Sequence, residues 1–256
     1  MRVSIITVCY NSEKYIRTCM ESFLEQDYPD KEHVIIDGKS SDNTVAIVKE
    51  YNPDVLISEP DNGLYDAINK GIKHCSGDII ALLHADDVFA DKYVISRMEK
   101  LIREKNVDTA YADLLYVQQD NIDRCIRYWR SGVFSKQKLS HGWAPPHPTF
   151  FVKKEVYEKY GTFNTHYKIA ADYDIMTRFL GLHNVSTAYC PCVTIKMRMG
   201  GMSNRCLGNI FQKSKEDFTI ARLNHIGGLF TVIFKNLRKI HQFRLLTNIS
   251  KDISAL

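Results

Sequence analysis

Residues 3–26, VSIITVCYNSEKYIRTCMESFLEQ, predict a buried strand followed by an amphipathic helix. The segment Val3–Cys9 is rich in β-branched side chains, which is typical of a strand that is covered on both faces. Asn11 or Ser12 is a suitable N-terminal cap for the helix. The helix carries an apolar stripe, because four large side chains recur at helical spacing: Ile16, Met20, Phe23 and Leu24.

The alternation of strand and helix patterns continues to residue 117. Further strands are predicted at residues 33–36, 55–58, 79–83 and 109–117, and further helices at residues 41–51, 64–75 and 92–105. This order is typical of an α/β protein with a mainly parallel sheet flanked by helices. The pattern loosens over residues 118–149. We then expect a strand at 150–152, helices at 153–160 and 172–180, two strands around Pro191 within 185–199, and a helical C-terminal extension.

The composition excludes several classes of protein. Among the 256 residues, 45% are hydrophobic and 25% are charged, which is ordinary for a soluble globular chain and unlike a disordered one. No apolar run approaches the roughly 20 residues that span a bilayer, and the N-terminus lacks the features of a signal peptide. The seven cysteines include no CxxC pair, which argues against a disulfide framework or structural zinc. We therefore expect a cytoplasmic protein with reduced thiols.

Basic residues are concentrated near the C-terminus. Residues 218–251 contain no Asp or Glu and carry a charge of +6, so the rest of the chain carries −2 of the net +4. Because this excess is local, we predict no nucleic-acid partner. The same segment contains a helical apolar stripe: Ile226, Leu229, Phe230, Ile233, Leu237 and Ile240. A basic amphipathic helix can bind an anionic membrane surface. The alternative is a helix that packs its stripe on the rest of the protein, and Gly227 and Gly228 argue against one long helix.

Polar and acidic residues follow the predicted parallel strands. Ligands of such sheets bind beyond the carboxyl ends of the strands. The residues in question are Thr7, Tyr10 and Asn11 after the first strand, Asp37 after the second, Glu59 and Asp61 after the third, and His84, Asp86 and Asp87 after the fourth. A loop or helix-cap role accounts for Asp42 and Asp61. Two adjacent carboxylates after a buried strand repel each other, so Asp86 and Asp87 favour a site for Mg²⁺ or Mn²⁺.

No phosphate-binding loop accompanies these carboxylates. The sequence contains neither GxxxxGK[ST] nor GxGxxG after the first strand. P-loop NTPases and dinucleotide-dependent dehydrogenases are therefore disfavoured. The remaining interpretation is a phosphorylated ligand that is bound through a metal ion.

Over residues 1–205 the chain resembles the family 2 glycosyltransferases, which have the GT-A fold and use nucleotide sugars. Five stretches carry the resemblance: residues 3–29, residues 35–48 (IIDGKSSDNTVAIV), residues 58–89 (SEPDNGLYDAINKGIKHCSGDIIALLHADDVF), residues 147–179 (HPTFFVKKEVYEKYGTFNTHYKIAADYDIMTRF) and residues 198–203 (RMGGMS). The chain is most similar to bacterial members that build surface polysaccharides such as O-antigen or capsule. The resemblance implies a nucleotide-sugar half (1–117), an acceptor half (118–205) and a basic helical extension (206–256).

The family pattern also implies roles for individual residues. Tyr10 would stack on the base and Asp37 would accept a hydrogen bond from it. Asp87, helped by Asp86, would hold Mn²⁺ or Mg²⁺ against the diphosphate, and Asp172 would act as the general base. The other implied nucleotide-sugar contacts are Thr7, Asn11, Asn69, Lys70 and Arg198. Simpler roles remain open: core packing for Tyr10, a solvated helix face for Asn69 and Lys70, and a helix cap for Asp172.

The chain departs from the family pattern at three positions. Gly38 replaces the second of two Asp residues that are common after the second strand. His84 stands where a small or acidic residue is common. On the acceptor side a frequent Glu-Asp pair is Ala171-Asp172 here, with Asp174 displaced by two residues.

The implied reaction is inverting transfer of a hexose, with glucose or galactose favoured, from a UDP-sugar. The implied acceptor is a hydroxyl of an undecaprenyl-diphosphate-linked saccharide, which places the protein at the cytoplasmic face of the inner membrane. Two alternative functions fit the sequence less well. A nucleotidyltransferase would need a Gly-rich basic loop after the first strand, which is absent. An inactive sugar-nucleotide-binding module should have lost Asp87 or Asp172, and both are present.

Overall fold

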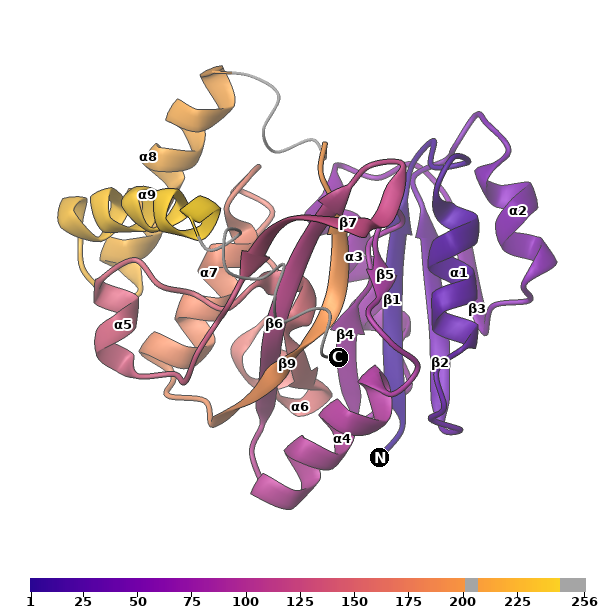
Figure 1. Ribbon diagram of the computed structural model, residues 1–256, viewed down its shortest axis with the longest axis horizontal. Helices are drawn as coiled ribbons and strands as arrows, with labels where there is room; N and C mark the ends of the chain where they lie inside the picture. The colour runs from indigo at the N-terminus through magenta and orange to yellow at the C-terminus, as the bar shows by residue number, and fades with distance from the viewer. Residues whose placement is uncertain (201–206, 245–256) are drawn as a thin grey trace.

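A computed structural model describes residues 1–200 and 207–244, with the side chains of 207–210 and 239–244 left out of the description. One curved sheet runs through the molecule and helices cover both of its faces (Figure 1). The strands are β1 (Val3–Cys9), β2 (Lys31–Asp37), β3 (Val55–Ser58), β4 (Ile79–Leu82), β5 (Val88–Phe89), β6 (Thr109–Gln118), β7 (Asn121–Trp129), β8 (Phe151–Lys153) and β9 (Thr187–Arg198). The helices are α1 (Ile16–Leu24), α2 (Thr44–Glu50), α3 (Leu64–His74), α4 (Val94–Lys105), α5 (Lys136–Ser140), α6 (Lys154–Tyr160), α7 (Ala171–Thr177), α8 (Leu207–Leu223) and α9 (Leu229–Arg244), with a 3-10 turn at His147–Thr149 and a π-helical turn at Arg178–Leu182.

The sheet has the strand order β3-β2-β1-β4-β8-β6-β9-β5, and β7 pairs with β6. Its long ladders β1–β2 and β6–β9 are parallel, and β3–β2 and β1–β4 are parallel as well. The short strand β8 is antiparallel to both β4 and β6 and so joins the two parallel groups. The predicted mainly parallel sheet flanked by helices is confirmed. Since β1, β4 and β9 run in one direction, their carboxyl ends lie at the same edge, at the top of Figure 1.

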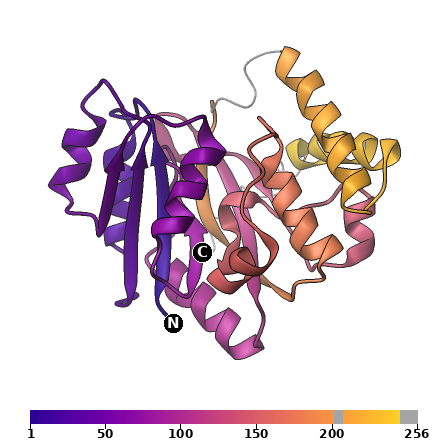
Figure 2. The ribbon, with the colours of Figure 1, turned by 180° about the vertical axis from the view of Figure 1, so that it is seen from behind.

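Two apolar clusters cover the two faces of the sheet. Helices α3, α6 and α7 pack on the face that Figure 2 brings to the front, where Ile6, Tyr111 and Phe179 are buried. Helices α1 and α4 pack on the other face, around Ile5 and Met98. Because alternate residues of β1 enter opposite clusters, the strand is apolar throughout, as its sequence predicted.

The structure corrects several local predictions. Helix α1 begins at Ile16 with Tyr15 at its N-cap, and no side chain caps it. Asn11 and Ser12 instead bind the loop before α2: the Asn11 Oδ1 accepts from the Ser41 N–H at 2.9 Å, and the Ser12 N–H donates to the Thr44 hydroxyl at 2.7 Å. Strands β5 and β7 were not predicted. The region around Pro191 forms the single strand β9 with a register shift, and not two strands.

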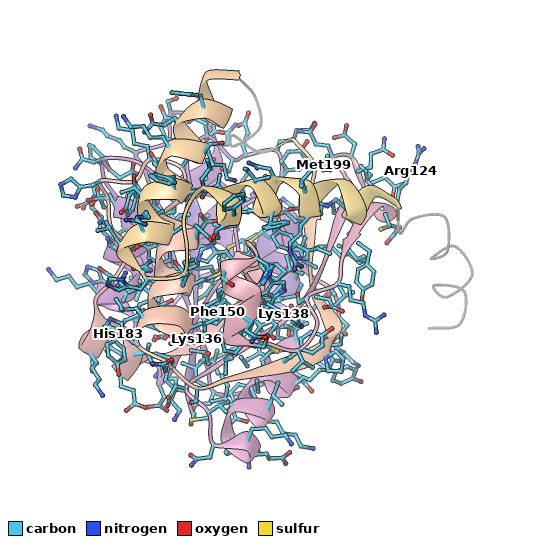
Figure 3. The ribbon with its side chains drawn as sticks, turned by 90° about the vertical axis from the view of Figure 1, so that its left-hand side faces the viewer. Arg124, Lys136, Lys138, Phe150, His183 and Met199 are labelled. Atoms are coloured by element: carbon cyan, nitrogen blue, oxygen red, sulfur yellow. The ribbon has the colours of Figure 1, made fainter. Side chains whose placement is uncertain are left out.

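The C-terminal segment forms a helical hairpin, and not a single helix from Ile226. Ile226 is buried before α9 begins, and its Cγ2 would lie 2.7 Å from a Cβ placed on Gly181. Gly142 approaches α9 as closely, because a Cβ there would lie 2.4 Å from the Lys235 backbone nitrogen. Helix α9 therefore packs directly on the end of α5, as Figure 3 shows beside the labelled Lys138.

Within residues 1–200 and 207–244, none of the helices combines the length and the apolar character needed to cross a membrane.

Candidate active site

Asp86 and Asp87 lie in the loop between β4 and β5, at the carboxyl edge of the sheet. Asp87 is 1% exposed, and its Oδ1 accepts from the backbone N–H of Arg198 at 3.3 Å. Its Oδ2 is buried without a hydrogen-bond partner in the described part of the chain. Burial and the neighbouring Asp86 raise the pKa of Asp87 well above its usual value. A buried carboxylate oxygen without a donor is costly unless a cation neutralises it.

These features test whether the site fits a divalent ion. The free Oδ2 of Asp87 and the adjacent carboxylate of Asp86 are hard oxygen ligands, which Mg²⁺ and Mn²⁺ prefer. No group of three His, Cys, Asp or Glu side chains that could enclose an ion occurs in the described residues. An ion at Asp87 would therefore keep coordination positions for substrate oxygens, as Mg²⁺ commonly does with phosphates.

Arg198, at the end of β9, holds this loop in place. Its Nη1 donates to the Asp86 carbonyl at 2.6 Å, its Nε to the Gln119 carbonyl at 3.0 Å, and its Nη2 to the Thr18 hydroxyl at 3.2 Å. The guanidinium also lies 4.9 Å from the centre of the Tyr15 ring. The Arg198 side chain is buried, and all three of its guanidinium nitrogens donate hydrogen bonds. In this structure Arg198 therefore positions the loop that carries Asp86 and Asp87.

Asp172 lies in the first turn of α7, but it is not the cap of that helix. The N-cap is Ala170, and its side chain makes no capping bond. The Asp172 carboxylate is half-buried, and its Oδ1 accepts a hydrogen bond from the adjacent Tyr173 N–H at 2.8 Å. Asp174, by contrast, is buried and binds Arg178 at 3.3 Å and Asn224 at 3.2 Å. Of the two acids, Asp172 has a carboxylate that remains available for chemistry.

Two imidazoles lie near Asp172, and one of them, that of His84, also lies near Asp86. The rings of His84 and His147 lie 6.4 Å apart, and neither makes a hydrogen bond to another described residue. Burial lowers the pKa of His147 to about 4, and the negative charge of Asp172 opposes that shift. Burial also lowers the pKa of His84, against the charges of Asp86 and Asp172. Asp86, Asp172 and the two imidazoles therefore lie near one another, and burial disfavours the charged form of both rings.

The opposite end of the site contains Tyr10 after β1. Its side chain is 65% exposed, so core packing does not account for it. Beside it, a Cβ on Gly38 would lie 3.4 Å from the Tyr10 Cδ2 and only 2.5 Å from the Asp61 Oδ2. The Asp61 carboxylate thus occupies the space that a side chain at position 38 would need, and its Oδ1 accepts from the Gly63 N–H at 2.8 Å. The sequence assigns Asp61 a loop or helix-cap role, and its bond to Gly63 agrees with that role. Its position beside Tyr10 was not predicted, and the glycine at position 38 is the signal that could have indicated it.

Asp37 is placed differently from the expectation. It is fully buried, and its carboxylate accepts hydrogen bonds from the Ser58 hydroxyl at 2.6 Å and from the Ser40 N–H at 3.0 Å. The Ser40 hydroxyl donates to it as well. Asp37 therefore shapes the loop before α2, together with Asn11, and the acid beside Tyr10 is the half-buried Asp61.

Three other expected contacts have structural partners in this arrangement. Thr7 is fully buried and bonds His33 Nε2 at 2.9 Å. Asn69 binds both backbone groups of Phe163, at 2.8 and 2.9 Å, and so ties α3 to the segment that follows α6. Lys70 donates to the Pro60 carbonyl at 2.8 Å and pairs with Glu59 at 2.8 Å. The polar groups of all three side chains are used in these contacts, so the three residues are not part of the proposed nucleotide site.

Comparison with known proteins identifies the family. The sequence model described as Glycosyl transferase family 2 matches residues 4–170. A glycosyltransferase of Mycobacterium tuberculosis, described as uncharacterized, is 30% identical over 198 residues, which cover 76% of this chain and 72% of that protein.

Two solved structures share the fold. The crystal structure of S. aureus TarS 1–349 with UDP-GlcNAc superposes with a TM-score of 0.67 at 19% identity, covering 91% of this chain and 69% of that one. The mannosyltransferase PcManGT of Pyrobaculum calidifontis, in complex with GDP-Man and Mn²⁺, gives a TM-score of 0.63 at 19% identity, covering 87% and 64%. The expected GT-A fold is thereby confirmed. Since the family model spans more than half of the sequence, the chain belongs to glycosyl transferase family 2.

Proposed function

We propose that this glycosyltransferase is a metal-dependent, inverting enzyme that transfers a hexose from a UDP-sugar to a lipid-diphosphate-linked saccharide in surface polysaccharide synthesis. The observation that carries the proposal is the buried Oδ2 of Asp87, which has no hydrogen-bond partner among the described residues, together with the available carboxylate of Asp172. A binding module needs neither group, and the sheet edge offers no Gly-rich basic loop for nucleotidyl transfer.

At the donor end, the side chains would bind the nucleotide and its charge. Tyr10 offers an exposed ring on which a base can stack, and Asp61 offers an acceptor beside it. Asp87 and Asp86 would hold the divalent ion, which when bound neutralises the diphosphate as the sugar–phosphate bond breaks. Arg198 and Asp37 fix the two loops that carry these groups.

At the acceptor end, Asp172 would accept the proton of the attacking hydroxyl. Attack by that oxygen from the side opposite the leaving group gives a single displacement, which inverts the anomeric configuration. The neutral rings of His84 and His147 would bind sugar hydroxyls, since their nitrogens have no partner among the described residues. Their burial disfavours the imidazolium form, which favours neutral rings that do not form an ion pair with Asp172.

Donor choice can be tested by thermal shift with Mn²⁺ and a panel of nucleotide sugars. We expect UDP and one UDP-hexose to raise the melting temperature, because binding to the folded state stabilises it. Replacing Tyr10→Ala should remove stacking worth ~1–3 kcal/mol and so weaken UDP binding by at least about tenfold. Tyr93→Ala, at an exposed tyrosine before α4, is the matched control. Equal shifts for wild type and Tyr10→Ala would remove Tyr10 from the site.

The outer face of the helical hairpin supports attachment to a membrane. Eight of its large apolar side chains are exposed: Phe211, Phe218, Leu223, Leu229, Phe230, Ile233, Phe234 and Leu237. The packed face of α9 uses other residues, because Thr231 and Val232 are buried and Lys235 pairs with the buried Asp217 at 2.7 Å. Four residues of the predicted apolar stripe are therefore exposed, namely Leu229, Phe230, Ile233 and Leu237, whereas Ile226 is buried and the side chain of Ile240 lies outside the described residues. The side chain of Lys235 is 14% exposed and belongs to the packed face of α9.

Exposed large apolar side chains concentrated on two neighbouring helices are typical of an interaction site. We infer that the hairpin lies in the headgroup region of the cytoplasmic leaflet, with Arg222 and Arg238 near anionic lipids. The lipid of the acceptor would hold its saccharide at the same surface. Docking would then place the site formed by Asp172 and Asp87 within reach of it.

Flotation with anionic liposomes tests this attachment. The double variant Phe230→Ser/Ile233→Ser should fold normally, because both side chains are exposed, yet bind vesicles at least ~10-fold more weakly. Leu24→Ser, at an exposed leucine of α1, should bind like the wild type. Truncation within α8 is a poorer test, since the Glu216 carboxylate binds the backbone N–H groups of residues 168–170. Unchanged flotation of the double variant, or binding that ignores lipid charge, would contradict membrane docking.

A further inference from the structure

Strand β9 carries a bulge that brings two cysteines together. Tyr189 pairs with Tyr111 and Val193 with Asp113, so three residues of β9 lie opposite one residue of β6. The three residues are Cys190, Pro191 and Cys192. In a regular strand, residues two apart are separated by roughly 6.6 Å along the chain. Here the bulge folds the side chains toward each other, and the two Sγ atoms are 2.9 Å apart.

The surroundings of the pair make its two thiols unequal. Cys192 is half-buried, whereas Cys190 is buried. The guanidinium of Arg97 on α4 lies with its Nη1 3.6 Å from the Cys192 Sγ, and Arg97 is held by Asp91 at 3.2 Å. The hydrogen bond from Cys190, together with the positive charge of Arg97, lowers the pKa of Cys192 to about 7 despite its burial. Burial and the bond to Cys192 raise the pKa of Cys190.

We propose that Cys190 and Cys192 form a reversible dithiol–disulfide site that reacts with low-molecular-weight disulfides such as oxidised glutathione. The Cys192 thiolate attacks one sulfur of the disulfide, forming a mixed disulfide and releasing one thiolate of glutathione. Cys190 then loses its proton, and its sulfur attacks Cys192 Sγ, which forms the protein disulfide and releases the second glutathione thiolate. The protein loses two electrons and two protons, and the glutathione disulfide is reduced.

The bulge favours this second step over a lasting adduct. The two sulfurs are already in contact, so closing the bond requires a movement of about 1 Å toward the usual S–S length. Pro191 has no N–H to lose from the ladder, and it is exposed at the apex of the bulge. Three of the other cysteines, Cys9, Cys19 and Cys75, are buried, and burial raises the pKa of each. They are therefore poor competitors as nucleophiles.

Intact-mass analysis of the whole chain after exposure to oxidised glutathione tests the proposal. The wild type should become lighter by two hydrogen atoms, carry no glutathione, and return to its starting mass with dithiothreitol. Cys190→Ser should gain and retain the mass of one glutathione, bound to Cys192. Cys192→Ser should show neither the loss of two hydrogen atoms nor an added glutathione at residues 190–192. Cys125→Ser, at a half-buried cysteine of β7, should behave like the wild type. A lasting adduct on the wild type, or no reaction at residues 190–192, would overturn the assignment.

The role of Arg97 gives a second readout. Arg97→Gln should slow alkylation of Cys192 by iodoacetamide at pH 7 by several-fold, since the thiolate loses its cation. Arg103→Gln, on the same helix and paired with Glu99 at 3.1 Å, is the matched control and should leave the rate unchanged. An unchanged rate in Arg97→Gln would show that this guanidinium does not activate Cys192.

Discussion

Replacing Asp172→Asn is expected to abolish sugar transfer while UDP still binds. The carboxylate is not a helix cap and is not used by another side chain in the described structure, so its loss should leave α7 intact. Without a base, the acceptor hydroxyl must lose its proton to water, and such a loss typically costs ~10²–10⁴-fold in rate. Steady-state release of UDP in the presence of acceptor measures the rate, and calorimetry measures the affinity for UDP.

The neighbouring acid provides a matched comparison. Asp174 is buried in contacts with Arg178 and Asn224, so Asp174→Asn should lower the melting temperature of the protein. Asp172→Asn should leave that temperature nearly unchanged. If Asp172→Asn instead lost UDP binding together with activity, Asp172 would be a structural residue and the base would lie elsewhere.

Replacing Asp87→Asn is expected to lower transfer by at least about 100-fold, the scale of losing one group that stabilises developing charge. An amide has no negative charge with which to hold a cation, although it fills the same space. The fold should survive, because a neutral amide is cheaper to bury than the carboxylate, whose pKa is raised by burial.

Asp91→Asn is the matched control for this change. Asp91 follows β5 only four residues after Asp87, but it pairs with Arg97 at the surface. Its replacement should leave transfer within about twofold of the wild type, as is usual for surface changes. Comparable losses in both variants would mean that the loop, and not the ion site, limits activity.

Much of the fold could be predicted because periodicity reports burial directly. The apolar runs of β1, β2 and β4 and the helical spacing in α3 and α4 lie within a few residues of their predicted positions. Strand β7 was not predicted, because its polar and aromatic residues do not alternate clearly. The bulge at Cys190 and Cys192 depends on the register between β6 and β9, which no local pattern reveals.

The site was predictable in its charges and less so in its hydrogen bonds. Adjacent Asp86 and Asp87 after a buried strand are expensive without a cation, so the sequence alone pointed to them. Whether an acid faces a ligand or a loop depends on which donors the fold brings near. Asp37 meets two serines and is buried, while Asp61 enters the space left by Gly38. The different placement of Asp37 and Asp61 depends on contacts between three separate loops, which no single stretch of sequence reveals.

The most direct test of the metal-dependent site is calorimetric titration of UDP into the protein with Mn²⁺ and with EDTA. We expect wild-type affinity to fall by at least about tenfold when the ion is removed, since the carboxylates of Asp86 and Asp87 then repel the diphosphate. In Asp87→Asn, Mn²⁺ should no longer strengthen binding, whereas Asp91→Asn should respond like the wild type. Equal UDP affinity in Mn²⁺ and in EDTA, for the wild type, would contradict the account.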